Sequence, residues 1–138
     1  DSVLIIESIG KGVILTPIDQ FLKRTTNRHQ VARLKPQYTH LVPQALGYSL
    51  LCMGMPYDDD FLYGNGKYYC SELIYDAFKH ANRGKPFFKL FPMTYKEPGT
   101  GNFYPVWEHH FKQSNLEIPE GLPGCNPGSR IRSGLSVS

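Results

Sequence analysis

One cysteine stands where a reactive thiol could be activated. The stretch "KYYCSELIYDAF", Lys67 to Phe78, places Cys70 between a strand-like aromatic run and an amphipathic helical pattern. The positive end of a helix and its unpaired N–H groups stabilise a thiolate, which is the nucleophilic form of cysteine. The same N–H groups can hold a developing oxyanion. A small buried apolar residue is the alternative interpretation, because free cysteines are commonly buried.

The residues after Cys70 show the spacing of a helix with one apolar face. The apolar positions that recur on this face are Leu73, Ile74, Ala77, Phe78 and Ala81. The polar positions expected on the opposite face are Glu72, Asp76, Lys79 and His80. Gly84 is typical of the residue that ends a helix. The pattern therefore predicts a helix that starts at Cys70 and is finished by Gly84.

The first third of the chain predicts a hairpin, a short helix and a further strand. Short apolar runs at 3–6 and 13–15 flank Gly10 and Gly12, which favours a hairpin turn. Thr16 is a suitable N-cap and Pro17 a suitable first residue for a helix over "TPIDQFLKR". Residues 30–34 read as another strand. Together with the helix after Cys70, these elements predict an α+β fold with a small antiparallel sheet packed against that helix.

The middle and the end of the chain are less regular. A long helix is predicted from about 37 to 53, with Pro43 moving its true start towards Thr39 or His40. "MPYDDDFLYGNGK", 55–67, is typical of a loop. The segment 117–138 is rich in Gly, Pro and Ser, and we expect an extended tail there. We predict one domain over residues 1–138.

Composition excludes several functional classes. The chain has 138 residues and a formal charge of +3. Its basic residues are scattered, which argues against nucleic acid as a partner because phosphate binding needs a clustered basic face. No apolar run approaches the ~20 residues of a membrane span. The three cysteines contain no CxxC pair, so we predict neither a metal nor another cofactor.

Several motifs together resemble the YiiX-like family of permuted papain-fold amidases, relatives of the NlpC-type peptidases. The block "YYCSEL" with "GMPYDDDFLY" upstream is the most specific part of the resemblance. "LIIESIGKGVILTPIDQFL" and "VARLK" resemble earlier segments of that family, and "FPMTYKEPGTGNFYPVW" resembles bacterial members more loosely. The resemblance implies a circularly permuted papain-like fold in which a histidine-bearing strand precedes the nucleophile helix.

The resemblance also implies roles for particular residues. Cys70 would be the nucleophile, and Glu7 would orient the imidazole of the catalytic histidine. Tyr57 and Asp58 lie in the motif loop, where they would either bind substrate or close the turn. Tyr69, next to the nucleophile, would contact substrate.

The expected histidine is missing from the position that the resemblance gives it. The histidines of this chain are His29, His40, His80, His109 and His110, and none of them precedes Glu7. His80 would lie roughly 15 Å along the helix from Cys70, too far to serve as its base. Adjacent histidines on a helix face apart, so His109 and His110 are expected at the surface and not at a shared metal. Either the catalytic histidine lies N-terminal to Asp1, or this is a short form without a base.

Four functional interpretations follow. The leading one is a cysteine amidase or peptidase that cleaves an amide, including those of cell-wall peptides, through a thioester. An acyltransferase or lipid hydrolase of the same superfamily, an inactive binding module, and a structural domain with Cys70 in its core are the alternatives. An exposed sheet edge would favour a homodimer. Bacterial relatives suggest the cell envelope, although no sorting signal is visible.

Overall fold

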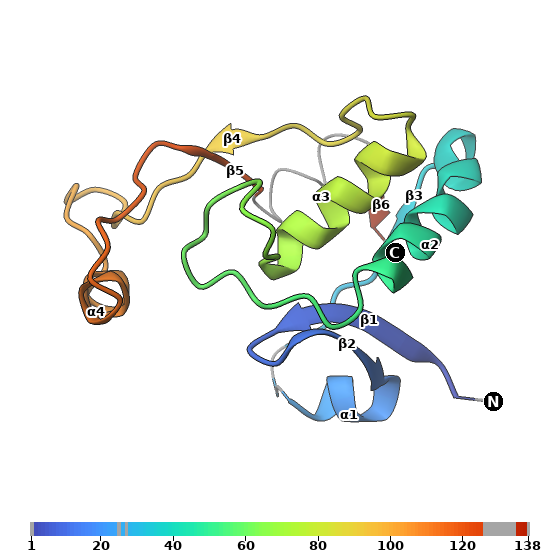
Figure 1. The fold of residues 1–138 in the computed structure, drawn as a ribbon, viewed down its shortest axis with the longest axis horizontal. Coiled ribbons are helices and arrows are strands. Elements are labelled where there is room, and N and C mark those ends of the chain that lie inside the picture. The colour runs from blue at the N-terminus through green and yellow to red at the C-terminus, as the bar shows by residue number, and fades with distance from the viewer. Residues whose placement is uncertain (1, 25, 27, 126–134, 138) are drawn as a thin grey trace.

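The computed structural model describes residues 2–24, 26, 28–125 and 135–137. Its strands form three two-stranded antiparallel sheets, β1 with β2, β3 with β6 and β4 with β5 (Figure 1). The strands are β1 Leu4–Ile9, β2 Gly12–Pro17, β3 Ala32–Leu34, β4 Phe91–Pro92, β5 Pro123–Gly124 and β6 Leu135–Val137. The helices are α1 Ile18–Lys23, the 3-10 helix η1 Pro36–Leu41, α2 Val42–Leu51, α3 Cys70–Ala81 and α4 Pro105–Gln113.

The β1–β2 hairpin packs beneath α3 and the segment that leads into it (Figure 1). Val13 is buried in a cluster with Tyr68 and Leu73. The Val13 N–H donates to the Met55 carbonyl over 2.9 Å, and at Gly12 a Cβ would lie 2.4 Å from the same oxygen. A side chain at position 12 would therefore prevent this close approach of the two backbones.

Helix α3 is the centre of the fold. On one side, small and apolar residues let α2 and α3 pack closely, and this cluster consists of Leu34, Leu41, Ala45, Ala77 and Ala81. On another side, Tyr75 packs with Tyr69, Phe88 and Cys125 in an aromatic cluster. Gly84, with φ 79°, ends the helix region by donating its N–H to the Lys79 carbonyl over 2.9 Å. The predicted start at Cys70 and the predicted end at Gly84 are confirmed.

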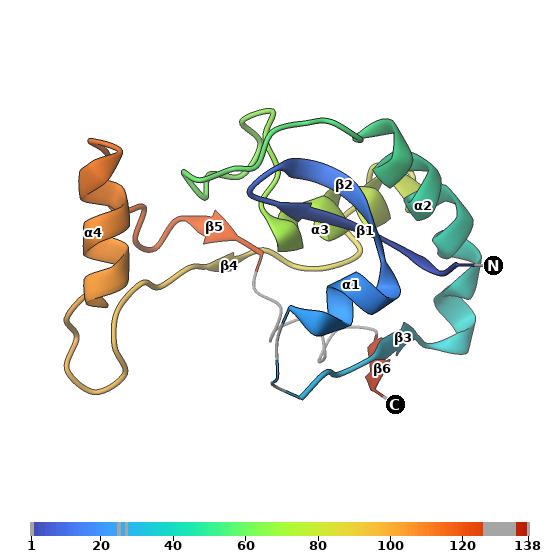
Figure 2. The same ribbon diagram turned by 90° about the horizontal axis from the view of Figure 1, so that it is seen from below.

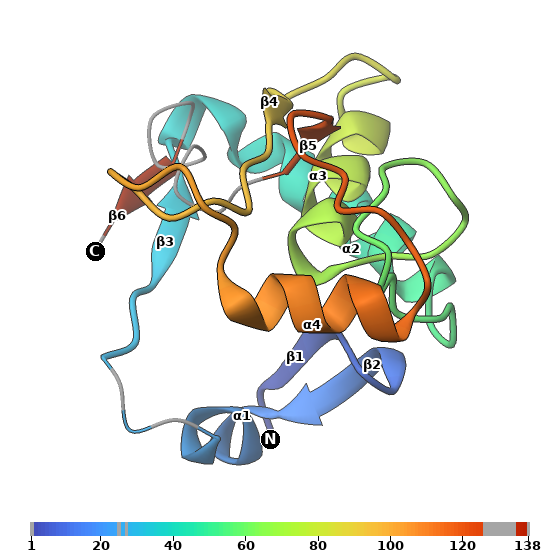
Figure 3. The same ribbon diagram turned by 90° about the vertical axis from the view of Figure 1, so that its left-hand side faces the viewer.

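Helix α4 lies at the opposite end of the molecule from α2 (Figure 2). Two chain segments lead to and from it, and they pair as β4 and β5 (Figures 2 and 3). Glu120 joins the same two segments by accepting hydrogen bonds from the Tyr95 N–H and the Thr94 hydroxyl, both over 2.8 Å. The Tyr69 hydroxyl, just before α3, contacts the Met93 sulfur over 3.9 Å and so places the segment from 91 to 95 beside the start of α3.

The structure corrects several details of the predicted elements. The helix predicted over 37–53 is split into η1 and α2, with Pro43 in the first turn of α2, because proline fits only the start of a helix. Thr16 and Pro17 belong to β2, and α1 begins at Ile18. Helix α4 was not predicted. The predicted tail over 117–138 contains β5 and β6, and its residues 126–134 lie outside the described part of the chain.

Candidate active site

Cys70 is the first residue of α3 and is exposed, whereas Cys52 and Cys125 are buried. The alternative in which Cys70 is a core residue is therefore wrong. Its neighbours Tyr69 and Ser71 are buried and tie the helix start to Cys125. The Cys125 N–H donates to the Tyr69 hydroxyl over 2.9 Å, and the Ser71 hydroxyl donates to the Cys125 carbonyl over 2.9 Å. The thiol is thus accessible while the backbone on either side of it is fixed.

A pocket of about 240 Å³ opens beside Cys70. Its walls come from five parts of the chain, namely the loop before α3, the start of α3, the segment after β4, α4, and Cys125 after β5. The apolar side chains that line it are Phe61, Tyr69, Met93, Tyr95 and Trp107. None of the described residues that line it carries a charge. The space next to the thiol is therefore suited to an uncharged group.

Phe61 holds the pocket wall together. It has φ 55°, a left-handed conformation that is costly for a bulky residue. Its ring lies 5.3 Å from Trp107 and 5.7 Å from Tyr69, between centroids, so the strained backbone is offset by aromatic contacts on both sides. These contacts attach α4 to the start of α3.

Tyr57 lies close enough to Cys70 for the charge of the thiolate to act on its hydroxyl. Burial raises the pKa of Tyr57 to about 12, and the negative charges of Cys70, Asp59 and Asp58 add to the rise. The hydroxyl is therefore protonated at neutral pH and available as a donor. The predicted role of Tyr57 in binding substrate stays a prediction, and this position supports it.

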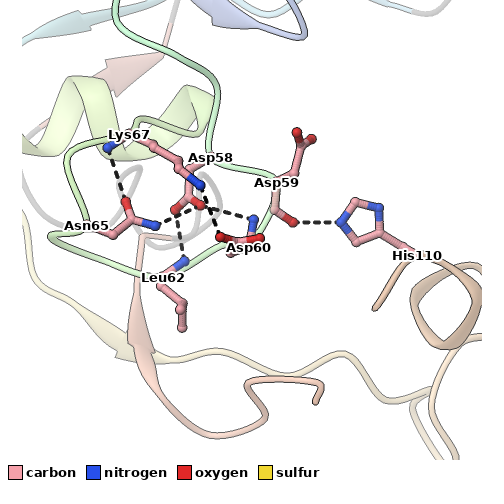
Figure 4. Close-up of polar contacts among 7 residues, drawn as sticks. All are labelled: Asp58, Asp59, Asp60, Leu62, Asn65, Lys67 and His110. Carbon is pink, nitrogen blue, oxygen red and sulfur yellow. Dashed lines mark hydrogen bonds and ion pairs between the residues drawn. The ribbon is translucent and has the colours of Figure 1, made fainter. Parts of the chain in front are cut away.

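Asp58 is completely buried and organises the loop before α3 (Figure 4). Its carboxylate accepts hydrogen bonds from the N–H groups of Asp60 and Leu62, over 3.0 and 2.9 Å, and from the Asn65 side chain over 3.0 Å. These contacts support the loop-closing alternative for Asp58. Substrate binding by Asp58 stays a prediction, although its side chain is enclosed.

Glu72 is also completely buried, which corrects its predicted place on the polar face of the helix. Its carboxylate accepts the Gly64 N–H over 2.9 Å and lies 3.4 Å from the Tyr69 N–H. Burial raises the pKa of Glu72 to about 7, while these two hydrogen bonds act in the opposite direction. Ile74, predicted on the apolar face, is instead 43% exposed. The hydrogen bond between Glu72 and the loop thus decides the burial of this residue, and the apolar spacing of the helix does not.

Glu7 is buried in β1 and forms an ion pair with Arg24. Its other carboxylate oxygen has no hydrogen-bond partner among the described residues. The next residue, Ser8, donates to the Tyr68 carbonyl over 2.6 Å, so Ser8 faces the segment before α3. Because successive residues of a strand face opposite ways, Glu7 faces away from that segment. That Glu7 orients an imidazole stays a prediction.

None of the histidines lines the pocket beside Cys70. His109 is exposed as predicted, but His110 is half-buried. Its Nε2 lies 2.6 Å from the Asp59 carbonyl oxygen (Figure 4). The centroid of its ring lies 5.8 Å from that of Phe61. His110 thus lies only partly at the surface, because α4 packs against the loop before α3. The described residues thus provide no imidazole in this pocket.

The walls of the pocket do not follow from the sequence patterns. Phe61 is far in sequence from Tyr95 and Trp107, and nothing local marks the three as neighbours. One signal for α4 was present, because Pro105 suits a first helical position and Trp107 and Phe111 have i, i+4 spacing.

Comparison with known proteins settles the family. The family described as permuted papain-like amidase enzyme, YaeF/YiiX, C92 family, matches residues 1–134. The chain belongs to this family. This confirms both the resemblance and the predicted permuted papain-like α+β fold. The crystal structure of the metalloprotein YiiX from Escherichia coli O157:H7 superposes with a TM-score of 0.76 at 20% identity, covering 99% of this chain and 75% of that one. No curated protein matches.

The residues that the structure describes form neither a candidate metal site nor a candidate membrane span. YiiX is described as a metalloprotein, but the described part of this chain brings together no group of three His, Cys, Asp or Glu side chains that could hold a metal. Within the same residues, no helix is both long and apolar enough to cross a membrane.

Proposed function

We propose that this member of the permuted papain-like amidases is a cysteine amidase or peptidase with Cys70 as its nucleophile. The observation that carries the proposal is the exposed thiol at the first position of α3, beside a pocket. In the proposed reaction the thiolate attacks an amide carbonyl, and the resulting thioester is resolved by water. The substrate is a peptide or another amide, and the resemblance suggests cell-wall peptides.

The surroundings of Cys70 suit an acyl-transfer step. A helix start presents N–H groups and a positive dipole end to the thiolate and to a developing oxyanion. Tyr57, whose pKa is raised by burial and then by the charge of Cys70, would offer its protonated hydroxyl as a second donor to the oxyanion. A Cys–His mechanism also needs an imidazole within hydrogen-bond reach of the thiol. The described residues place no histidine at the pocket beside Cys70, and in the proposal Glu7, one of whose carboxylate oxygens has no described partner, is the group that orients the imidazole.

Alkylation tests the nucleophile directly. We expect limiting iodoacetamide at neutral pH to modify Cys70 first in the native protein, with Cys52 and Cys125 reacting only after unfolding. Mass spectrometry of proteolytic fragments identifies the modified residue, and Cys70→Ser is the control. Native protein whose Cys70 resists alkylation would sink the proposal.

Acylation tests the thioester. We expect p-nitrophenyl acetate to leave an acetyl group on Cys70 that hydroxylamine removes, because hydroxylamine cleaves thioesters and leaves amides intact. An acetyl group that resists hydroxylamine would place the reaction on an amine and contradict the mechanism.

A further inference from the structure

The shape and lining of the pocket beside Cys70 specify more than an amide bond. Its volume of about 240 Å³ is below the ~300 Å³ at which pockets for whole small-molecule ligands begin, so it suits one side chain and not a complete ligand. The proposed nucleophile, Cys70, is one of the residues that line it. A group that fills it would therefore be attached close to the carbonyl that the thiol attacks.

The lining selects the kind of side chain. Four of the residues that line the pocket are aromatic, Phe61, Tyr69, Tyr95 and Trp107, and Met93 adds a thioether. Trp107 already packs edge-on against Phe61 and against Tyr95, each with centroids 5.3 Å apart. Aromatic groups gain from such contacts beyond the burial of apolar area, and methionine sulfur also favours ring edges.

The same lining disfavours charged side chains. Apart from Cys70 itself, no described residue of the pocket wall carries a charge that could pair with a lysine ammonium or a glutamate carboxylate. A charge placed there would lose its hydration without gaining a partner, which is strongly unfavourable. The pocket would therefore prefer aromatic side chains and discriminate against charged ones.

We propose that this pocket binds an aromatic side chain of the substrate, next to the scissile carbonyl, so that the enzyme prefers amides of phenylalanine-like residues. This inference rests on the proposed function, because it assumes that Cys70 is the nucleophile. Trp107 and Phe61 would then determine specificity by contacting the substrate ring.

Chloroacetamide probes measure this preference without requiring a catalytic base. In each probe the Cys70 thiolate displaces chloride from the methylene carbon, so a C–S bond forms as the C–Cl bond breaks. The probes carry phenylalanine amide, lysine amide, glutamate amide or octylamine, and their rates are divided by those with N-acetylcysteine. We expect the phenylalanine probe to modify Cys70 at least about tenfold faster than the lysine and glutamate probes.

Substitutions in the pocket test whether the preference for the phenylalanine probe arises there. Trp107→Ala removes one wall, and Thr94→Phe fills the space from the exposed rim, so both should abolish the preference for the phenylalanine probe. Val106→Ala is the matched control, because Val106 is the preceding residue of α4 and is 67% exposed. If loss of Trp107 unfolds α4, Thr94→Phe keeps the test decisive, because it gives up the Thr94–Glu120 hydrogen bond but keeps the one from the Tyr95 N–H to Glu120.

The outcomes separate this inference from the proposed function. Equal rates for all probes, or faster reaction with the charged probes, overturn the aromatic pocket while leaving Cys70 a nucleophile. Faster reaction with the octylamine probe overturns it in favour of an acyl chain.

A binding measurement covers the case in which Cys70 resists iodoacetamide and the proposed function fails. Trp107 is the single tryptophan, so its fluorescence reports on the pocket directly. Saturable quenching by N-acetyl-4-nitrophenylalanine amide, with no displacement by N-acetyl-lysine amide, supports the aromatic site. Absence of saturable quenching overturns it.

Discussion

The Gly64 N–H donates to the Glu72 carboxylate over 2.9 Å, and this bond joins the loop before α3 to the first turn of the helix that carries Cys70. Glu72 is fully buried, so the carboxylate is held between loop and helix and shielded from water. The position of Cys70 therefore depends on Glu72, a buried acid in the first turn of the same helix. The same acid links the stability of the site to pH.

Ionisation of Glu72 should make stability fall as pH rises. Burial raises its pKa from 4.5 to about 7, so between these values the folded protein holds a proton that the unfolded chain has lost. The free energy of unfolding then decreases with rising pH through this window, by about 3 kcal/mol if the full shift is expressed. Urea unfolding at pH 5, 6, 7 and 8 measures it.

We expect Glu72→Gln to flatten that pH dependence, because the amide does not titrate. The matched control is Asp19→Asn, which alters an exposed carboxylate on α1 and should keep the slope of the parent protein. A Glu72→Gln protein with the parent's slope would show that another group is responsible.

Asp58→Ala should destabilise the protein by roughly 3 kcal/mol, because the substitution removes the acceptor for three hydrogen bonds inside the loop. Amide exchange at Leu62 should become faster, since its N–H loses this partner. The neighbouring substitution Asp59→Ala is the control, because the Asp59 side chain is exposed and its effect should stay within about 0.5 kcal/mol. Equal effects of the two substitutions would contradict the loop-closing role.

The sequence predicts the helix start at Cys70 well, because local signals decide it. Apolar spacing, the change from an aromatic run, and Gly84 all act within a few turns of the helix. The same spacing misplaces Glu72 and Ile74, because a periodic pattern cannot register that a loop donor, the Gly64 N–H, needs a buried acceptor. Tertiary contacts overrule the amphipathic rule at these two positions.

The pocket could not be predicted from the sequence. Phe61 and Trp107 are separated by 46 positions and meet only because α4, at the end of the β4–β5 pair (Figure 2), packs against the loop before α3. No local pattern encodes that packing. Cys70 could thus be found from its own neighbourhood, whereas the residues that would choose its substrate could not.

Ser8→Ala should cost about 1 kcal/mol and loosen the hairpin from the segment before α3. The Ser8 hydroxyl donates to the buried Tyr68 carbonyl over 2.6 Å, and that carbonyl would keep only the Asp58 N–H at 3.2 Å. Thermal unfolding measures the loss. Ser114→Ala, which removes an exposed bond within the end of α4, should have little effect and is the control. Equal losses of stability in Ser8→Ala and Ser114→Ala would mean that the Ser8–Tyr68 hydrogen bond contributes no more to stability than an exposed one.

Tyr57→Phe should slow the acylation of Cys70 while leaving its alkylation nearly unchanged. The substitution keeps the ring, which packs 6.2 Å from that of Phe61 between centroids, and removes only the hydroxyl. Attack on an ester carbonyl creates an oxyanion that this hydroxyl would stabilise, so acylation by p-nitrophenyl acetate should slow at least about tenfold. Alkylation by iodoacetamide forms no oxyanion, and its rate should change less than about twofold. Tyr104→Phe, at an exposed tyrosine before α4, should leave both rates unchanged. If both reactions of Tyr57→Phe slow equally, the hydroxyl acts on the thiolate itself and not on the oxyanion.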